Sequence, residues 1–391
     1  MAEPPLKGIR VIELARILAG PWAGQLLADL GADVIKVESP DGGDDTRKWG
    51  PPFVMSHDGE NLSAAYYHAC NRGKRSIAID FSKPEGAETL RRLVATADVL
   101  IENFKLGGLK KYGLDYASLK AINPRLVYCS ITGFGQDGPY APRAGYDFII
   151  QAMAGMMSIT GEAGREPQKA GVAISDLFTG LYSVIAIQAA LRHAEKTGEG
   201  QHIDMALFDS QISALGNQNL NYLVSGKSPV QMGNAHMNIA PYEVLPVKDG
   251  HIILAVGNDG QFGKFCAVVG LTDLPANPDF ATNPARVTNR AKLRETIIEA
   301  LAAFDRDPLL AKLEAAGVPA SPINTIGQMF ADPQTIARGM RLDLDDGHGN
   351  LLPSVRAPML MSGTPLVYER PSPRLGEHTD EILAELERSA T

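Results

Sequence analysis

Ile9-Arg-Val-Ile-Glu-Leu14 is a short apolar-rich run, and Asp33-Val-Ile-Lys-Val-Glu38 is a second one. Between them lies Pro21 to Leu30, a stretch bounded by residues that are typical of the two ends of a helix. Proline stands near the start of that stretch and Gly31 follows its end, which is the usual asymmetry of a helix. The pattern therefore predicts that a βαβ unit begins the chain. The turn after the first run, Ala15 to Gly24, does not spell GxGxxG, which argues against a dinucleotide site of the NAD type.

The same alternation continues along the chain. Further strands are predicted at 76–80, 98–102, 126–131 and 202–206, and helices at 83–97, 147–157, 176–194 and 207–224. Strands that alternate with helices predict a parallel sheet with helices on both faces. We therefore expect an α/β fold with a doubly wound large domain.

Composition changes after Val224, where loop-like residues are followed by an expected β-hairpin, 242–247 and 251–256, with Asp249-Gly250 in its turn. Helical stretches follow near residues 261, 289 and 309. We place a smaller α+β domain at 226–325 and expect a large domain of 1–225 plus 326–391. The tail is expected to hold another hairpin around 346–350 and a helix over 380–387.

Composition narrows the classes of function. The 37 basic and 45 acidic residues give a net charge of −8, so the chain lacks the overall positive charge that is typical of nucleic-acid-binding proteins. The first seven residues lack the apolar core of a signal peptide, and the uncharged run 177–191 is shorter than a bilayer span, so we expect a cytoplasmic protein without a membrane partner. Three widely spaced cysteines indicate reduced thiols, and the eight histidines lack metal-site spacing, so we expect no metal.

The stretch Gly171-Val-Ala-Ile-Ser-Asp-Leu-Phe-Thr-Gly180 holds one carboxylate, Asp176, ahead of an apolar helix. A carboxylate at such a position is poorly hydrated and can act as a nucleophile. The alternative is that Ser175 or Asp176 only caps the helix. From this stretch alone, the cap is the commoner outcome.

A basic segment, Asn71-Arg-Gly-Lys-Arg-Ser-Ile-Ala-Ile-Asp80, precedes a predicted strand, and Arg47 and Lys48 follow another. Two cationic loops at the ends of strands in an acidic protein suggest an anionic ligand such as a nucleotide phosphate. The alternative is a solvated basic loop. Asn103-Phe104, at the end of a strand, offers an amide beside a ring that could stack on a ligand or belong to the core.

The order of these motifs closely resembles the class III, formyl-CoA transferase-like, CoA-transferase family. The resemblance covers nearly the whole chain and rests on 6–14, Ala19-Gly-Pro21, 30–38, 71–80, Glu102-Asn-Phe104, 171–180, Gly233-Asn-Ala-His236 and 375–380. It implies a Rossmann-like CoA-binding domain, a small second domain, and a homodimer of two interlocked chains. It also implies that CoA and acyl-CoA are substrates, together with a carboxylic acid acceptor, and that no cofactor is tightly bound.

Carried over residue by residue, the resemblance matches Asp176 to the catalytic aspartate of the family. It implies contacts with CoA or its thioester at Leu18, Ala19, Ile79, Asn103, Phe104, Lys111, Tyr146 and Asp147. Gly233, Asn234 and His236 resemble a mobile loop over the active site. Some members carry arginine where this chain has Ser39-Pro40, so Lys48, Lys74 and Arg75 remain the candidates for the CoA phosphates.

The same fold also carries α-methylacyl-CoA racemases, in which a histidine stands at the position of Tyr146. Tyrosine is a poor proton shuttle at neutral pH, because its reference pKa is about 10, and this favours transfer. The implied reaction begins with attack of Asp176 on a thioester and proceeds through an aspartyl anhydride and an aspartyl-CoA thioester. The alternatives are a racemase or another acyl-CoA isomerase, and a CoA-binding protein without catalysis, against which the presence of Asp176 argues.

Overall fold

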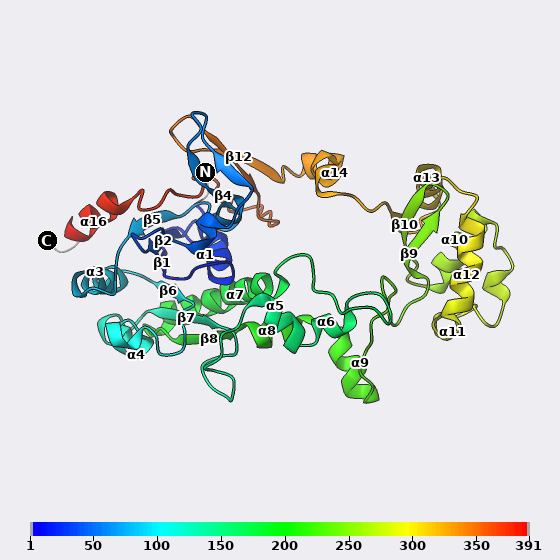
Figure 1. The fold of residues 1–391 in the computed structure, drawn as a ribbon, viewed down its shortest axis with the longest axis horizontal. Helices are drawn as coiled ribbons and strands as arrows, with labels where there is room; N and C mark the ends of the chain where they lie inside the picture. Colours follow the sequence, from blue (N-terminus) through cyan, green and yellow to red (C-terminus); the bar gives the residue numbers. More distant parts are fainter. Residues whose placement is uncertain (1–2, 389–391) are drawn as a thin grey trace. The chain divides into compact units, whose positions relative to one another are not determined.

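The computed structural model describes residues 3–388, which form two compact units (Figure 1). Of the described residues, unit 1 comprises 3–156, 170–224 and 333–388, and unit 2 comprises Met157–Lys169 and Ser225–Asp332. The chain therefore returns to unit 1 at residue 333, seven positions later than the sequence pattern suggested. Nothing in the composition of residues 157–169 indicated that they belong to the second unit.

A six-stranded sheet organises unit 1, with strand order β5-β2-β1-β6-β7-β8. Its strands are β5 (Arg75–Ala78), β2 (Asp33–Glu38), β1 (Arg10–Glu13), β6 (Val99–Glu102), β7 (Val127–Thr132) and β8 (His202–Ala206). Every neighbouring pair is parallel, as the alternation of strands and helices predicted. The carboxyl ends of these strands lie along one edge, where ligands of parallel sheets commonly bind.

Both faces of this sheet are buried. Along β1, Val11 belongs to one apolar cluster and Ile12 to the other, because successive side chains of a strand point to opposite faces. One cluster includes residues of α1 (Ala19–Asp29), α7 (Ile174–Thr197) and the start of α8 (Leu207–Ala214). The other includes residues of α3 (Pro84–Ala95), α4 (Tyr116–Ile122) and α16 (Thr379–Arg388). The sheet is thus the middle of three layers.

Helices α1 and α7 pack closely at Gly180. A Cβ atom added there would lie 2.8 Å from the carbonyl oxygen of Ala19 and 3.0 Å from Cδ1 of Trp22. Only glycine allows this approach, so the first turn of α1 rests on α7 about one helical turn after Asp176. α7 also has the length and composition of a membrane span, but it contacts α1, α8 and β7, as a core helix of a globular domain does.

Unit 2 is built on the small antiparallel sheet β11-β10-β9. The expected hairpin is β9 (Tyr242–Val247) and β10 (Gly250–Ala255), and β11 (Ala320–Ser321) pairs with the open edge of β10. Apolar side chains of these strands and of the surrounding helices form one core. The helices of this unit are α10 (Asp259–Val269), α11 (Asn283–Thr288), α12 (Arg290–Leu301), α13 (Arg306–Ala315) and α14 (Ile326–Ala331), with the short η3 (Leu274–Ala276).

Two predicted helices are shorter than expected, because glycines with positive φ interrupt them. Gly155 (φ +89) separates α5 (Asp147–Met153) from α6 (Met156–Ile159), and Gly216 (φ +56) separates α8 from α9 (Asn217–Ser225). The sequence did not predict the hairpin of β3 (Phe53–Met55) and β4 (Asn61–Ala64). The remaining elements are η1 (Asp45–Lys48), α2 (Ala65–His68), η2 (Lys110–Tyr112), α15 (Pro333–Ala337), and the expected tail hairpin β12 (Arg341–Asp345) and β13 (Leu351–Val355).

Replacing Gly180 with alanine should lower the free energy of unfolding. Overpacking of a tight contact lowers the free energy of unfolding by about 1–3 kcal/mol. The better helix propensity of alanine raises it by about 1 kcal/mol at most. Urea denaturation followed by circular dichroism measures the difference. Gly263→Ala is the matched control, because Gly263 also lies inside a helix but an added Cβ meets nothing within 4 Å. Its stability should be unchanged or higher, and equal stability of both variants would contradict the close α1–α7 contact.

Candidate active site

Asp176 lies in the first turn of α7. The helix begins at Ile174 with Ala173 as its N-cap, so Asp176 is the third helical residue. The interpretation of Ser175 or Asp176 as the residue that starts the helix is therefore wrong. At this position the unpaired N–H groups of the helix terminus favour negative charge on a nearby carboxylate.

The carboxylate of Asp176 is partly buried and, among residues 3–388, has no hydrogen-bond or ion-pair partner. Burial raises the pKa of Asp176 to about 7, and the neighbouring carboxylate of Asp147 adds to the effect. An ordinary cap or a surface aspartate would be paired or solvated. An unpaired, poorly hydrated carboxylate is instead suited to react with an electrophile, and a raised pKa makes its anion a stronger base.

Asp147 connects α5 to the start of α7. It is the first residue of α5, and Tyr146, which is 63% exposed, is the N-cap. One carboxylate oxygen of Asp147 accepts a hydrogen bond from the backbone N–H of Ser175 at 2.8 Å. The other oxygen accepts a hydrogen bond from Nε2 of Gln151 at 2.7 Å. The buried Gln151 also accepts the backbone N–H of Ala170 at 2.9 Å. Asp147 therefore holds the residue next to Asp176 and fixes the entry into α7.

The ring of Tyr66 belongs to the same neighbourhood. Burial raises the pKa of Tyr66 to about 12, and the charges of Asp176, Cys70 and Asp147 contribute. Its phenol is therefore neutral at physiological pH and available as a donor. The ring of Trp49 packs edge-on against it with 5.3 Å between centroids.

The loop between β1 and α1 carries Leu18 and Ala19. Leu18 is the N-cap of α1 without any side-chain cap, and Ala19 is the first helical residue. The amide of Asn103 holds this loop at Arg16: its oxygen accepts the Arg16 N–H at 3.0 Å and its nitrogen donates to the Arg16 carbonyl at 2.7 Å. Thus Asn103 and the loop lie together at the carboxyl ends of β6 and β1.

Phe104 lies beside this loop in an aromatic cluster. Its ring packs edge-on on Phe81 at 5.7 Å, and Phe81 contacts Tyr112 at the same distance. The ammonium of Lys111 lies 4.6 Å from the ring centroid of Tyr112. Ile79 directly follows β5 and is 8% exposed. The structure therefore brings Phe104 and Lys111 into one cluster that also includes Phe81 and Tyr112.

The cations proposed for phosphate binding are placed differently. Lys74 is fully buried, and its ammonium contacts Glu13, Asn71 and the carbonyl of Pro21. Arg75 is 4% exposed and forms ion pairs with Asp33, Glu381 and Glu385. Neither cation is available to a ligand in this arrangement. Lys48, at the end of η1, is exposed.

Gly233, Asn234 and His236 belong to unit 2. Gly233 has φ +61, and its N–H donates to the carbonyl of Gly161 at 2.9 Å. The imidazole of His236 accepts the N–H of Asn238 at 3.1 Å and lies 5.3 Å from the ring of Tyr242. These contacts hold the segment within its own unit.

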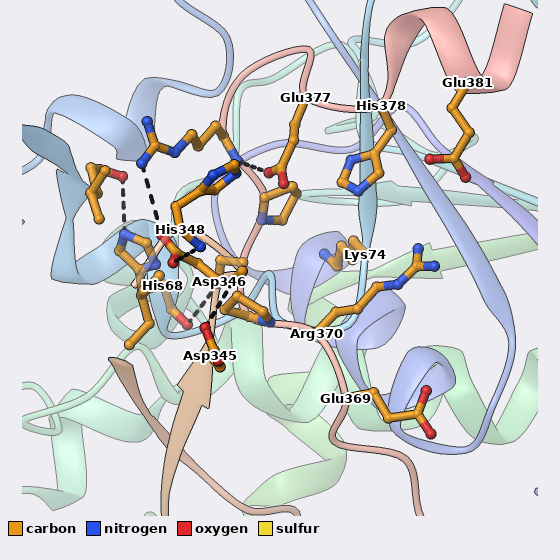
Figure 2. Close-up of a pocket in the computed structure, with 17 residues that line it drawn as sticks. His68, Lys74, Asp345, Asp346, His348, Glu369, Arg370, Glu377, His378 and Glu381 are labelled. Atoms are coloured by element: carbon orange, nitrogen blue, oxygen red, sulfur yellow. Dashed lines mark hydrogen bonds and ion pairs between the residues drawn. The ribbon is translucent and has the colours of Figure 1, made fainter. Parts of the chain in front are cut away.

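A cavity of about 290 Å³ in unit 1 does not include Asp176 among its lining residues (Figure 2). Figure 2 shows that the β12–β13 turn and the tail line it, with Asp346, His348, Arg370, Glu377 and His378 around the space. Of the residues expected at the site, only Lys74 lines this cavity. Within residues 3–388, no group of three or more histidine, cysteine or acidic side chains could hold a metal ion.

Comparison with known proteins identifies the family of the chain. The model of CoA-transferase family III matches residues 6–379. The chain belongs to CoA-transferase family III. A succinate–glutarate CoA-transferase from Agrobacterium fabrum is 63% identical and covers 100% of this chain and 98% of its own length. The human succinyl-CoA:glutarate CoA-transferase is 41% identical and covers 98% of this chain and 86% of its own length.

The fold is also that of a solved relative. A CAIB/BAIF family protein from Brucella suis has a TM-score of 0.88 and 62% identity, and the match covers 99% of this chain and 100% of that one. This confirms a mixed α/β fold with a central parallel sheet. The family III chain is a CoA-transferase that acts on CoA thioesters, so the transferase hypothesis is supported over the racemase and the non-catalytic alternatives.

Two residues near Asp176 were not identified from the sequence. Gln151 follows Asp147 by four positions, and this helical spacing could have indicated the pair. Tyr66 gave no such signal, because Asp147 and Asp176 lie far away from it along the chain.

Replacing Asp147 with asparagine should move the acid limb of the pH profile to lower pH. In the wild type, kcat/KM should fall as pH decreases through about 7, because protonation removes the Asp176 anion. The asparagine side chain keeps an acceptor for the Ser175 N–H but lacks the charge that raises the pKa of Asp176, so the midpoint should decrease. The midpoint of the limb is an apparent pKa of the active enzyme.

Glu195→Gln is the matched control, since Glu195 is an exposed carboxylate on the same helix, about 28 Å further along at 1.5 Å per residue. Salt screens a surface charge at that distance, so the midpoint should not move. An acid limb that is identical in the wild type and Asp147→Asn would refute the electrostatic coupling.

Proposed function

We propose that this CoA-transferase moves CoA from succinyl-CoA to a short dicarboxylate such as glutarate, and that Asp176 carries the covalent intermediates. The Agrobacterium relative is named for succinate and glutarate, and the human relative for succinyl-CoA and glutarate. The observation that carries the proposal for Asp176 is its unpaired and poorly hydrated carboxylate in the first turn of α7.

The reaction proceeds by exchanges at one carboxylate. An oxygen of Asp176 attacks the thioester carbonyl, the C–S bond breaks, and CoA leaves as a thiolate from a mixed anhydride. The thiolate then attacks the aspartyl carbonyl, releases the donor acid, and leaves an aspartyl-CoA thioester. The acceptor carboxylate attacks this thioester to form a second anhydride, and the thiolate attacks the acceptor's carbonyl. The products are the new acyl-CoA and the free carboxylate of Asp176.

The described residues support parts of this sequence. N–H groups at the start of α7 and the neutral phenol of Tyr66 are donors suited to stabilise a tetrahedral oxyanion. Partial burial of Asp176 limits water at the anhydride, which would otherwise be hydrolysed. We assign Tyr146 and Asp147 to the surroundings of the thioester, with Asp147 as the group that orients the start of α7.

We assign CoA to the surface formed by Leu18, Ala19, Asn103 and Phe104, with Ile79 and Lys111 toward the adenine end. These residues lie at the carboxyl edge of the sheet, which is the usual ligand position in parallel α/β folds. Lys48 is the remaining cation for the phosphates, since Lys74 and Arg75 are engaged in buried ion pairs. No tightly bound cofactor is needed.

We further propose an interlocked homodimer with a Rossmann-like CoA domain, in which the Gly233–His236 segment covers the active site as a mobile loop. Large apolar side chains on α5, α7 and α9, among them Phe148, Ile185 and Leu223, are exposed in the single chain, and such surfaces mark interaction sites. We place the protein in the cytoplasm, where its three free cysteines remain reduced.

Asp176→Ala should lower kcat for CoA transfer from succinyl-CoA to glutarate by about a thousandfold or more, because no other group can form the anhydride. Affinity for CoA and the fold should persist, since a first-turn carboxylate contributes only about 0.3–1 kcal/mol to a helix. Product acyl-CoA is measured by mass spectrometry. Asp209→Ala is the control, because Asp209 is an exposed carboxylate in the first turn of α8. Turnover of Asp176→Ala near that of the control would refute the assignment.

A further inference from the structure

The loop between β1 and α1 is held in an unusual backbone conformation. Ile17 has φ +76, in the left-handed region that β-branched residues almost never adopt. Ser63 is the other described non-glycine residue with positive φ. Strain of this kind persists only where the surroundings enforce it, and it concentrates at ligand sites and active sites. Leu18 and Ala19 follow directly, so the conformation of Ile17 sets the direction in which α1 begins.

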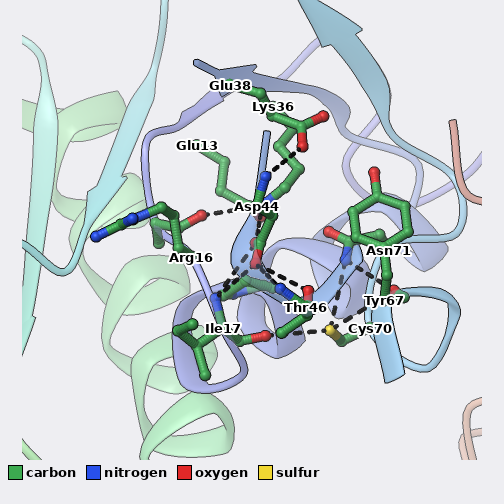
Figure 3. A network of polar contacts seen from close by, with 12 residues as sticks. Glu13, Arg16, Ile17, Lys36, Glu38, Asp44, Thr46, Tyr67, Cys70 and Asn71 are labelled. Carbon is green, nitrogen blue, oxygen red and sulfur yellow. Dashed lines mark hydrogen bonds and ion pairs between the residues drawn. The ribbon is translucent and has the colours of Figure 1, made fainter. Parts of the chain in front are cut away.

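Asp44 is the group that holds Ile17 (Figure 3). Its two carboxylate oxygens lie 3.3 and 3.2 Å from the backbone nitrogen of Ile17 and accept its N–H. Asp44 is fully buried and also accepts the backbone N–H and the hydroxyl of Thr46, at 3.0 and 2.8 Å. It therefore joins η1, which follows β2, to the loop that follows β1.

Lys36 supplies the charge that makes this buried carboxylate stable. Its ammonium lies 3.0 Å from Asp44 and donates to Glu13 at 3.1 Å and to the carbonyl of Ala15 at 3.0 Å. Burial alone would raise the pKa of Asp44, but the charge of Lys36 and the hydrogen bonds of Thr46 lower it below its usual value. Gly24 makes room for the network, because a Cβ there would collide with the carboxylate of Glu13.

Outside groups hold the backbone of the loop at each residue from 15 to 17. Lys36 holds the carbonyl of Ala15, Asn103 holds both backbone groups of Arg16, and Asp44 holds the N–H of Ile17. The thiol of Cys70 approaches the Ile17 carbonyl at 3.6 Å, as Figure 3 shows. A loop that only connected a strand to a helix would not require a buried carboxylate, a buried cation and an amide.

We propose that Asp44 is a positioning residue for CoA: by fixing Ile17 in the left-handed conformation, it presents the backbone of Leu18 and Ala19 to the thioester end of the ligand. The inference rests on the proposed assignment of CoA to this loop. The close contact of Ala19 with Gly180 places the start of α1 beside the helix that carries Asp176. A prearranged loop avoids the entropic cost of ordering on binding.

Asp44→Asn tests the proposal through the dissociation constant of free CoA, measured by isothermal titration calorimetry. The amide nitrogen would face Lys36 or the Ile17 N–H, donor against donor, and the left-handed conformation would lose its support. We expect the dissociation constant of CoA and the KM for acyl-CoA to rise about tenfold, the change that one lost charge-assisted hydrogen bond produces. The KM for the acceptor carboxylate should not change.

Rescue distinguishes positioning from general damage. Glycine adopts positive φ without strain, so Ile17→Gly in the Asp44→Asn background should restore most of the affinity for CoA. Asp41→Asn is the matched control, because Asp41 is an exposed carboxylate in the same segment between β2 and η1. The affinity of this variant for CoA should equal that of the wild type. A lower melting temperature of Asp44→Asn with unchanged affinity would overturn the proposal, as would failure of glycine to rescue a folded double variant.

Ile17→Pro provides a test that leaves the buried charges paired. Proline fixes φ near −65° and removes the N–H that Asp44 accepts, so affinity for CoA should decrease as in Asp44→Asn. Wild-type affinity in Ile17→Pro would also overturn the proposal. Because free CoA is the probe, the result does not depend on Asp176. An active Asp176→Ala variant would refute the proposed covalent intermediate but would not affect the inference about Asp44. Unchanged CoA affinity in Asp44→Asn would refute the inference about Asp44 but would not affect the proposed intermediate.

Discussion

The close contact of α1 with α7 at Gly180 is the constraint on which the site depends. Because no side chain separates the two helices there, the loop that begins α1 and the first turn of α7 lie next to each other. One element carries the surface to which we assign CoA, and the other carries Asp176. A bulkier residue at this point would move Asp176 away from the surface to which we assign CoA, and it would also loosen the core.

The charged groups near α7 and those near α1 differ in whether they are paired. On the α7 side, Asp176 is left without an ion-pair partner among the described residues and beside a second carboxylate, so its pKa rises to about 7. On the α1 side, buried charges are paired, and Lys36 joins Glu13 and Asp44. A buried pair of this kind contributes little net stability, but it fixes geometry, and here the geometry is that of the Ile17 loop.

Local signals in the sequence predicted most of the elements but not their long-range partners. The βαβ unit and the Asp249-Gly250 hairpin were predicted because periodicity and turn chemistry are local, whereas Gly216 gave no sign that it would break a helix. The resemblance indicated Asp176 as the candidate nucleophile, and the structure places it in the first turn of α7, after the cap. Lys74 and Arg75 looked like phosphate ligands because sequence shows a charge but not its partners, and Arg75 is neutralised by Glu385, 310 residues away.

The most direct test of the account follows oxygen from the acceptor. In the proposed sequence the acceptor carboxylate leaves one of its oxygens on Asp176, so turnover with ¹⁸O-labelled glutarate should label the enzyme. Trypsin releases residues 170–192, in which Asp176 is the only side-chain carboxylate, so the label would be assigned without ambiguity. The account predicts a gain of about 2 Da per transferred oxygen in this peptide. Formation of glutaryl-CoA with no label in the peptide would contradict it.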